Sequence, residues 1–186
     1  MKPVYVALLA VVGSQPLAAQ TVVRPAAPLD SARAELRDAL VVLRDSLITI
    51  DGAAARLQRD FRTASAPSLI SRARIIRDAC ARSLRTVPPT RAALQAANLS
   101  HPKRLQLRRE LVVAMDTLKG VLRYCETEFS DMSKPGQAEV VRGYGNDHAG
   151  RVLAGIRSYE RTLRGFLQVM GIRMLPIGAH GRPSAG

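Results

Sequence analysis

Residues 36–61 decide the fold, and they read LRDALVVLRDSLITIDGAAARLQRDF. Apolar residues recur in this segment at intervals of four and three, which places their side chains along one stripe of an α-helix, as in the a and d positions of a heptad repeat. Asp30 or Ser31 can cap the start of this helix, and Ala66 and Pro67 are expected to mark its end. The apolar residues recur at alternating intervals of four and three: Leu36, Leu40, Leu43, Leu47, Ile50, Ala54, Leu57 and Phe61.

Three further segments repeat this spacing. A second stripe runs through residues 69–87 and stops at Pro88 and Pro89, after which a short helix over 90–98 is expected. The third and fourth stripes occupy residues 111–129 and 152–170. The chain is therefore predicted to be all-α, an up-down-up-down four-helix bundle whose second helix is broken by proline. The rival arrangement is an extended helical hairpin that buries its stripes by forming a homodimer.

The two cysteines, Cys80 and Cys125, fall on the stripes of the second and third helices. Counted from a reversal near Ser100, they lie 20 and 25 residues away, a mismatch of about 7 to 8 Å in helix rise. Extended backbone at residues 87–90 can absorb much of that difference, so a disulfide is predicted. Two free buried thiols are the alternative. A redox-active pair is not expected, because the cysteines do not form a Cys-x-x-Cys motif.

The first residues have the pattern of an export signal. Lys2 supplies a positive charge, residues 4–12 are apolar, and Ala18 and Ala19 suit a cleavage site. We expect a signal peptide at 1–19, a flexible linker at 20–28, the helical bundle at 29–171 and a disordered tail at 172–186. The apolar run is shorter than the roughly 20 residues that cross a bilayer. The mature chain is therefore expected to be periplasmic or secreted, where disulfides form, and to lack a transmembrane span.

No cofactor, metal ion or catalytic residue is predicted. The sequence has no Cys-x-x-Cys-His motif for haem attachment and no Glu-x-x-His pair for a di-iron centre. It also lacks a Gly-x-Ser-x-Gly elbow and a glycine-rich phosphate loop. His101 and His180 are expected to be solvated surface residues, because no partner ligands stand near them.

Segment 143–150 is the one local oddity, and it reads GYGNDHAG. Each glycine costs about 1 kcal/mol in a helix relative to alanine, so a loop or kink at the start of the fourth helix is favoured. Tyr144, Asn146, Asp147 and His148 could line a small polar site there. An enzyme of unnamed reaction class is therefore one alternative function.

The whole chain has a formal net charge of +13, and its basic residues gather in two parts of the sequence. Residues 151–182 hold six arginines and one acidic side chain, Glu160. Residues 72–109 hold ten basic side chains and one acidic one, Asp78. We predict an exported, non-enzymatic protein whose basic face binds an anionic envelope component, namely lipid headgroups or an envelope polymer, or else an acidic protein partner. Nucleic acid is less favoured, because few aromatic side chains are interleaved for base stacking. A small-molecule or haem carrier that uses the bundle interior is a further alternative. The residues expected to bind the anion are Arg72, Arg77, Arg85, Arg104 and Arg108.

Overall fold

Four helices make up most of the described chain. The computed structural model describes residues 29–177, with side chains from Arg33 onward, so the expected signal peptide at 1–19, the linker at 20–28 and residues 178–186 of the expected tail lie outside it. The helices are α1 (Leu29–Asp60), α2 (Ala66–Ala96), α3 (Pro102–Met132) and α4 (Ala138–Met170). No strand occurs between residues 29 and 177, and the all-α class is confirmed for this part of the chain.

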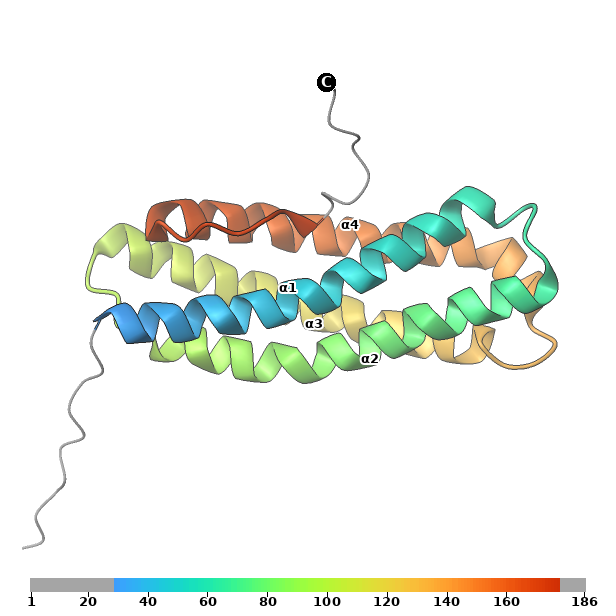
Figure 1. Cartoon of the computed structure of the whole chain (residues 1–186), viewed down its shortest axis with the longest axis horizontal. Coiled ribbons are helices and arrows are strands. Elements are labelled where there is room, and N and C mark those ends of the chain that lie inside the picture. Colours follow the sequence, from blue (N-terminus) through green and yellow to red (C-terminus); the bar gives the residue numbers. More distant parts are fainter. Residues whose placement is uncertain (1–28, 178–186) are drawn as a thin grey trace, which may run out of the picture.

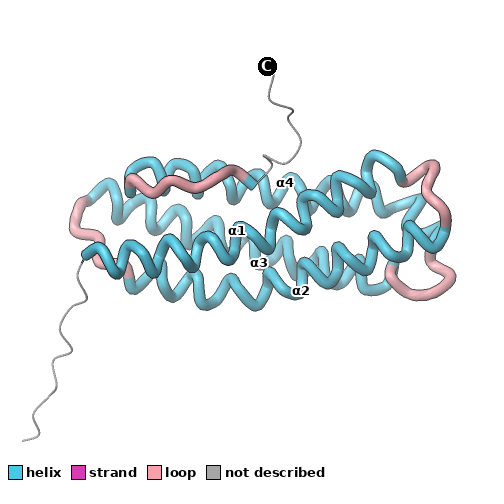
Figure 2. The backbone as a smooth tube through the Cα atoms, viewed as in Figure 1, coloured by secondary structure: helices cyan, strands magenta, loops and turns pink. Residues whose placement is uncertain are grey.

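Consecutive helices run antiparallel and lie side by side, which confirms the up-down-up-down four-helix bundle (Figure 1). α2 packs on both α1 and α3, whereas α4 packs on α3 and less extensively on α1. Short loops join the helices at the two ends of the bundle (Figure 2). All four apolar stripes are buried within one chain, so the observed arrangement is the closed bundle and not the extended hairpin.

The predicted stripes form the core. On α1, seven of the eight stripe residues are at most 1% exposed, and Phe61, just beyond the helix end, is partly buried. The other three stripes are also buried, with Ile76 on α2, Leu118 on α3 and Ile156 on α4 at 0% exposure, although Leu84 on α2 is only partly buried. Burying one such side chain contributes roughly 1.5–3 kcal/mol, so the heptad spacing accounts for much of the stability of the bundle.

A disulfide joins Cys80 on α2 to Cys125 on α3, as predicted, with 6.1 Å between their Cα atoms. Cys80 lies 16 residues before the end of α2, and Cys125 lies 23 residues after the start of α3. This offset of seven residues corresponds to about 10 Å of helix. Extended backbone absorbs it in the loop at 97–101, where Ala97 has a ψ of 121°, and not at 87–90 as predicted. As a result, α3 begins beyond the end of α2 (Figure 1).

The proline pair does not break α2, contrary to the prediction. Pro88 and Pro89 lie inside a continuous helix, although each removes one main-chain hydrogen bond. Proline inside a helix costs roughly 3 kcal/mol relative to alanine. The helix continues because Val87, Thr90 and Leu94 around the pair are buried against the other helices and offset that cost. α2 bends along its length and does not end at the pair (Figure 1).

The boundary between α1 and α2 also differs from the prediction. α1 ends at Asp60, and Ala66 and Pro67 begin α2. Proline fits the first turn of a helix, where its missing N–H costs no hydrogen bond. Arg142 of α4 binds the chain just after α1: its guanidinium donates to the main-chain oxygens of Phe61 at 3.3 Å, Arg62 at 2.9 Å and Ala64 at 3.4 Å.

Segment 143–150 is helical and belongs to α4, so the predicted loop or kink is wrong. Two of its glycines face α1. A Cβ atom on Gly145 would lie 3.4 Å from the Leu57 side chain, and one on Gly150 would lie 3.3 Å from the Gln58 side chain. These glycines let α4 approach α1 closely, and this contact offsets their low helix propensity.

Residues 172–177 return along α4 towards the middle of the bundle (Figure 1). The N–H of Ile177, which is 2% exposed, donates to the buried carboxylate of Glu160 at 3.1 Å. Arg44 of α1 donates to the carbonyl of Leu175. The tail is predicted to be disordered from residue 172, but Ile172, Met174 and Ile177 pack against the core of the bundle. The segment stays against the bundle because Ile177 adds apolar contact, and because the two hydrogen bonds join the segment to both α1 and α4.

Candidate functional site

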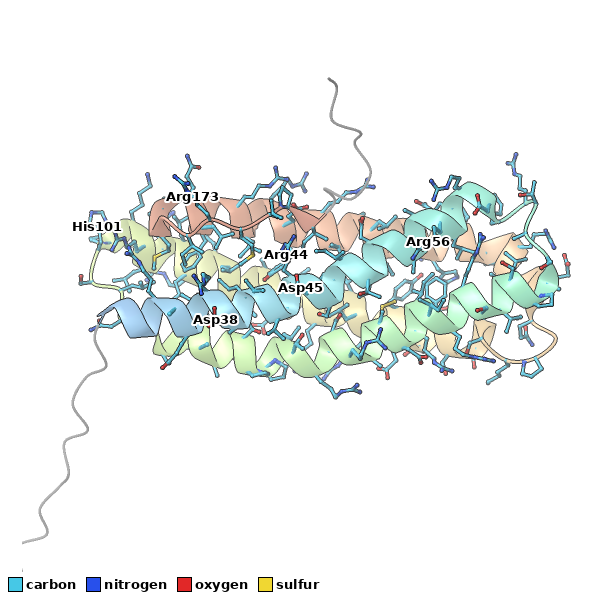
Figure 3. All side chains as sticks on the ribbon, viewed as in Figure 1. Asp38, Arg44, Asp45, Arg56, His101 and Arg173 are labelled. Carbon is cyan, nitrogen blue, oxygen red and sulfur yellow. A yellow bond between two sulfur atoms is a disulfide. The ribbon has the colours of Figure 1, made fainter. Side chains whose placement is uncertain are left out.

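Most charged side chains project outward from the described part of the bundle, as Asp45 and Arg56 illustrate (Figure 3). The buried polar residues Ser83, Thr90, Ser133 and Glu160 each make a hydrogen bond within the protein. Tyr159 differs, since its buried hydroxyl has no hydrogen-bond partner among the described residues. Burial raises the pKa of this hydroxyl, which therefore stays protonated and neutral. A charged ligand is therefore best sought on the outer surface.

Three of the five arginines predicted to bind an anion are occupied by contacts within the protein. Arg72 pairs with the carboxylate of Asp60 at 3.0 Å. Arg77 pairs with Asp78 at 2.7 Å. Arg108 donates to two main-chain oxygens at the end of α2, at 3.2 and 3.3 Å. These arginines hold helices and helix ends in place, and an anionic ligand would have to displace those contacts.

The remaining two predicted residues, Arg85 and Arg104, have no ion pair or hydrogen bond within the described part of the chain. The structure does not bring the five arginines together on one face. On α2, residues advance by about 100° each, so Arg72 and Arg77 point in directions about 140° apart. The neighbour that Arg85 does have is Arg82, one helical turn away, which also has no partner among the described residues. Arg82 was not among the predicted site residues, although its spacing of three residues from Arg85 places the two arginines on the same side of a helix.

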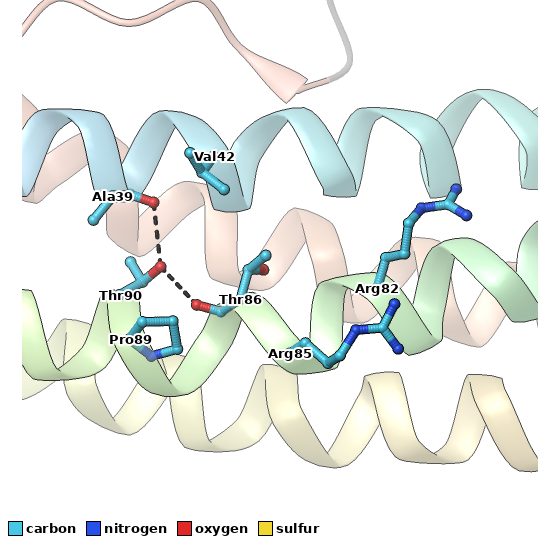
Figure 4. Close-up of a pocket in the computed structure, with 7 residues that line it drawn as sticks. All are labelled: Ala39, Val42, Arg82, Arg85, Thr86, Pro89 and Thr90. Atoms are coloured by element: carbon cyan, nitrogen blue, oxygen red, sulfur yellow. Dashed lines mark hydrogen bonds between the residues drawn. The ribbon is translucent and has the colours of Figure 1, made fainter.

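Arg82 and Arg85 line a groove of about 450 Å³ between α1 and α2. Figure 4 shows both arginine side chains extending from α2, with Val42 on α1 facing Thr86 and the two guanidiniums directed along the helices, away from Val42 and Pro89. The groove is otherwise lined by small or apolar groups, and Val42 is 57% exposed there. The full lining consists of Ala39, Val42, Arg82, Arg85, Thr86, Pro89 and Thr90.

The groove has a fixed floor, because Thr90 links the two helices that form it. The Thr90 hydroxyl lies 2.8 Å from the carbonyl of Thr86 on its own helix and 3.2 Å from the carbonyl of Ala39 on α1, and it shares its proton between them (Figure 4). Pro89 stands one residue earlier and presents an exposed, rigid ring. α2 therefore supplies an apolar wall that needs little rearrangement to receive a ligand.

The electrostatics of this groove are positive. Its lining contains two arginines and no acidic residue. The next acid along α1 after Val42 is Asp45, whose carboxylate is bound by Arg44 at 2.8 Å. A guanidinium presents several N–H donors in a fixed plane, which suits the oxygens of carboxylate and phosphate groups. The groove can therefore hold an anion beside an apolar group.

The polar residues of segment 143–150 do not converge on one site. Tyr144 is 63% exposed, and Asp147 is also exposed. Asn146 points its main-chain oxygen towards the side chain of Gln58, which donates to it at 3.4 Å. His148 alone faces α3. Since the segment is helical, its neighbouring side chains point in different directions around α4.

His148 belongs instead to a polar contact between α3 and α4. Its Nδ1 atom shares a hydrogen bond of 2.6 Å with the hydroxyl of Tyr124, and the two rings are stacked with centroids 5.6 Å apart. Nδ1 also lies 3.6 Å from the carboxylate of Glu128, and Arg151 donates to the Tyr124 hydroxyl at 3.4 Å. Tyr124, Glu128 and Arg151 were not among the predicted site residues. The four side chains satisfy one another and join the two helices.

The described residues contain no group of three or more His, Cys, Asp or Glu side chains that could hold a metal ion. His101 serves as the N-cap of α3, and its Nδ1 accepts a hydrogen bond of 3.3 Å from the N–H of Lys103. His180 lies outside the described residues. Between residues 29 and 177, no helix is both long and apolar enough to cross a membrane.

Comparisons of the chain with protein-family models, with curated proteins and with solved structures found no match.

Proposed function

We propose that this chain is an exported, non-enzymatic bundle protein that binds an anionic envelope component, and that Arg82 and Arg85 make the central contact. The observation that carries the proposal is that two arginines one helical turn apart line the same groove, and that neither has an acceptor among the described residues. Arginines elsewhere on α2, such as Arg72 and Arg77, are bound to acids of this protein. Those that remain unbound can donate hydrogen bonds to the oxygens of a lipid headgroup, an envelope polymer or an acidic protein partner.

Two further features support a location outside the cytoplasm. The pattern of residues 1–19 fits a signal peptide. The disulfide between Cys80 and Cys125 fits an oxidising compartment, where such bonds persist. The excess of 28 basic over 15 acidic residues favours attraction to the phosphate-rich surfaces found there.

Vesicle co-sedimentation tests this proposal. The purified mature chain is mixed with vesicles of phosphatidylcholine, with or without phosphatidylglycerol, at low and physiological ionic strength. We expect binding only to the anionic vesicles, and weaker binding at the higher salt concentration. An anionic polymer that competes with the vesicles would show that the anion, and not the bilayer, is recognised. Failure to bind either material would contradict the proposal.

A matched pair of double variants separates the Arg82–Arg85 site from net charge. Arg82→Gln with Arg85→Gln removes two positive charges from the groove. Arg157→Gln with Arg161→Gln removes the same charge from exposed positions on α4 that have no partner among the described residues. Each basic residue near an anionic surface contributes about 1 kcal/mol, so the groove variant should weaken binding by roughly 30-fold. Equal losses in both variants would mean that charge alone is responsible.

The two other functions considered from the sequence remain predictions. The carrier hypothesis assigns the ligand to the bundle interior, and the enzyme hypothesis assigns chemistry to segment 143–150. No specific observation among the described residues favours either hypothesis.

A further inference from the structure

The groove between α1 and α2 is more apolar than an anion alone requires. Val42 is 57% exposed in it, and the ring of Pro89 and the side chain of Ala39 continue the apolar surface. An inorganic anion or a polymer phosphate bound to Arg82 and Arg85 would leave this surface in contact with water. Pockets for small amphiphilic molecules combine an apolar wall with a few convergent polar groups, and their volumes of roughly 300–1,000 Å³ include the value found here.

Pro89, the second residue of the proline pair, gives the groove part of this character. Pro88 and Pro89 lack the N–H groups that would bond to carbonyls one turn earlier, and the ring of Pro89 replaces a flexible side chain by a rigid apolar one. Thr90 holds the same turn of α2 against the carbonyl of Ala39 on α1. The apolar wall therefore lies at one end of the groove, and the two guanidiniums lie at the other (Figure 4).

We propose that this groove binds a single-chain anionic amphiphile. Its carboxylate or phosphate contacts Arg82 and Arg85 at one end of the groove, and its hydrocarbon chain runs along the groove towards Val42, Ala39 and Pro89. This inference rests on the proposed function, because it uses the same two arginines, and it adds that one amphiphile molecule with a chain is the ligand. Charge complementarity selects the anion, and the adjoining apolar wall selects the chain.

Calorimetric titration with alkyl phosphates tests the inference on the mature, oxidised chain. The probes are inorganic phosphate, hexyl phosphate, decyl phosphate and decanol, all kept below the concentrations at which they form micelles. Decyl phosphate should bind with a stoichiometry of one and roughly tenfold more tightly than hexyl phosphate, because burial of two of its four additional methylenes suffices for that difference. Inorganic phosphate and decanol should each bind more weakly than decyl phosphate. Equal affinity for the two alkyl phosphates would overturn the inference.

Substitutions at exposed positions assign the two halves of the ligand. Val42→Ser should reduce the preference for decyl over hexyl phosphate, whereas Val140→Ser, the same change at an exposed valine of α4, should leave it unchanged. Arg82→Gln with Arg85→Gln should weaken both alkyl phosphates by at least tenfold. Val113→Ser alters a separate groove between α2 and α3. If this substitution reduced the preference for decyl over hexyl phosphate, the hydrocarbon chain would bind there, which would contradict the assignment.

The vesicle and titration experiments fail in different ways. If anionic vesicles still bind in a manner that depends on Arg82 and Arg85, but alkyl chain length has no effect, the amphiphile site is wrong and the proposed function stands. If neither vesicles nor alkyl phosphates respond to the Arg82 and Arg85 substitutions, both proposals are wrong.

Discussion

Breaking the disulfide between Cys80 and Cys125 should lower the stability of the bundle by about 4 kcal/mol. The bond closes a loop of 45 residues, and the chain-entropy relation for that length gives this value at 25 °C. The described region from 29 to 177 has an unfolding entropy of about 0.3 kcal/mol per kelvin at the average value per residue. The midpoint of thermal unfolding should therefore fall by about 10 to 15 °C.

The assay compares oxidised and reduced forms of the same chain, so that no side chain changes. Both sulfur atoms are fully buried. Reduction is therefore carried out in denaturant, and the thiols are kept reduced during refolding. Urea unfolding followed by circular dichroism then gives both free energies, and a Cys80→Ala, Cys125→Ala variant controls for effects of the reductant itself. A difference below about 1 kcal/mol would show that the reduced chain already keeps the two helices together when unfolded, which would refute the loop-closure reasoning.

Four further substitutions test the packing. Gly143→Ala should stabilise α4 by about 1 kcal/mol, since an added Cβ there meets no atom within 4 Å, whereas Gly155→Ala should destabilise it because its Cβ would lie 2.6 Å from Val121; urea midpoints distinguish the two. Arg142→Met keeps much of the apolar stem but removes the hydrogen bonds to the end of α1, and it should cost about 1 to 3 kcal/mol in the same assay. Burial raises the pKa of Tyr159, so above pH 10 the unfolded chain loses a proton that the folded chain keeps. The free energy of unfolding of the parent should therefore fall by about 1.4 kcal/mol per pH unit above pH 10. Tyr159→Phe should abolish this decrease, as urea unfolding at several pH values would show.

The helices and their core are predictable because a heptad repeat is a local property that survives in the structure. Each stripe residue is separated from the next by three or four positions, and this spacing alone determines which side of the helix is buried. The seven stripe residues from Leu36 to Leu57 on α1 are at most 1% exposed, as the repeat predicts. The disulfide follows from the same pattern, since both cysteines occupy stripe positions on adjacent antiparallel helices.

The errors concern residues that weaken a helix locally. Pro88 and Pro89 were interpreted as a break, and Gly143 to Gly150 as a loop, because each has poor helix propensity. In the structure, the buried neighbours of the prolines hold α2 together, and two of the glycines permit α4 to approach Leu57 and Gln58 of α1. The glycine contacts join residues about 90 positions apart, and the contact of Thr90 with Ala39 joins residues 51 positions apart. Helix propensity contains no information about either.

Charge balance along the sequence overstates how much positive charge is available to a ligand, because a main-chain carbonyl can hold an arginine as well as an acid can. Arg108 and Arg142 bind carbonyls at the ends of α2 and α1, where helical hydrogen bonds run out and the helix dipole is negative. No acidic residue marks those contacts in the sequence. Arg82 and Arg85 stand in the middle of α2, where most carbonyls are already bonded within the helix. Their position therefore leaves the two guanidiniums for a ligand, and the same reasoning explains why a count of basic residues could not single them out.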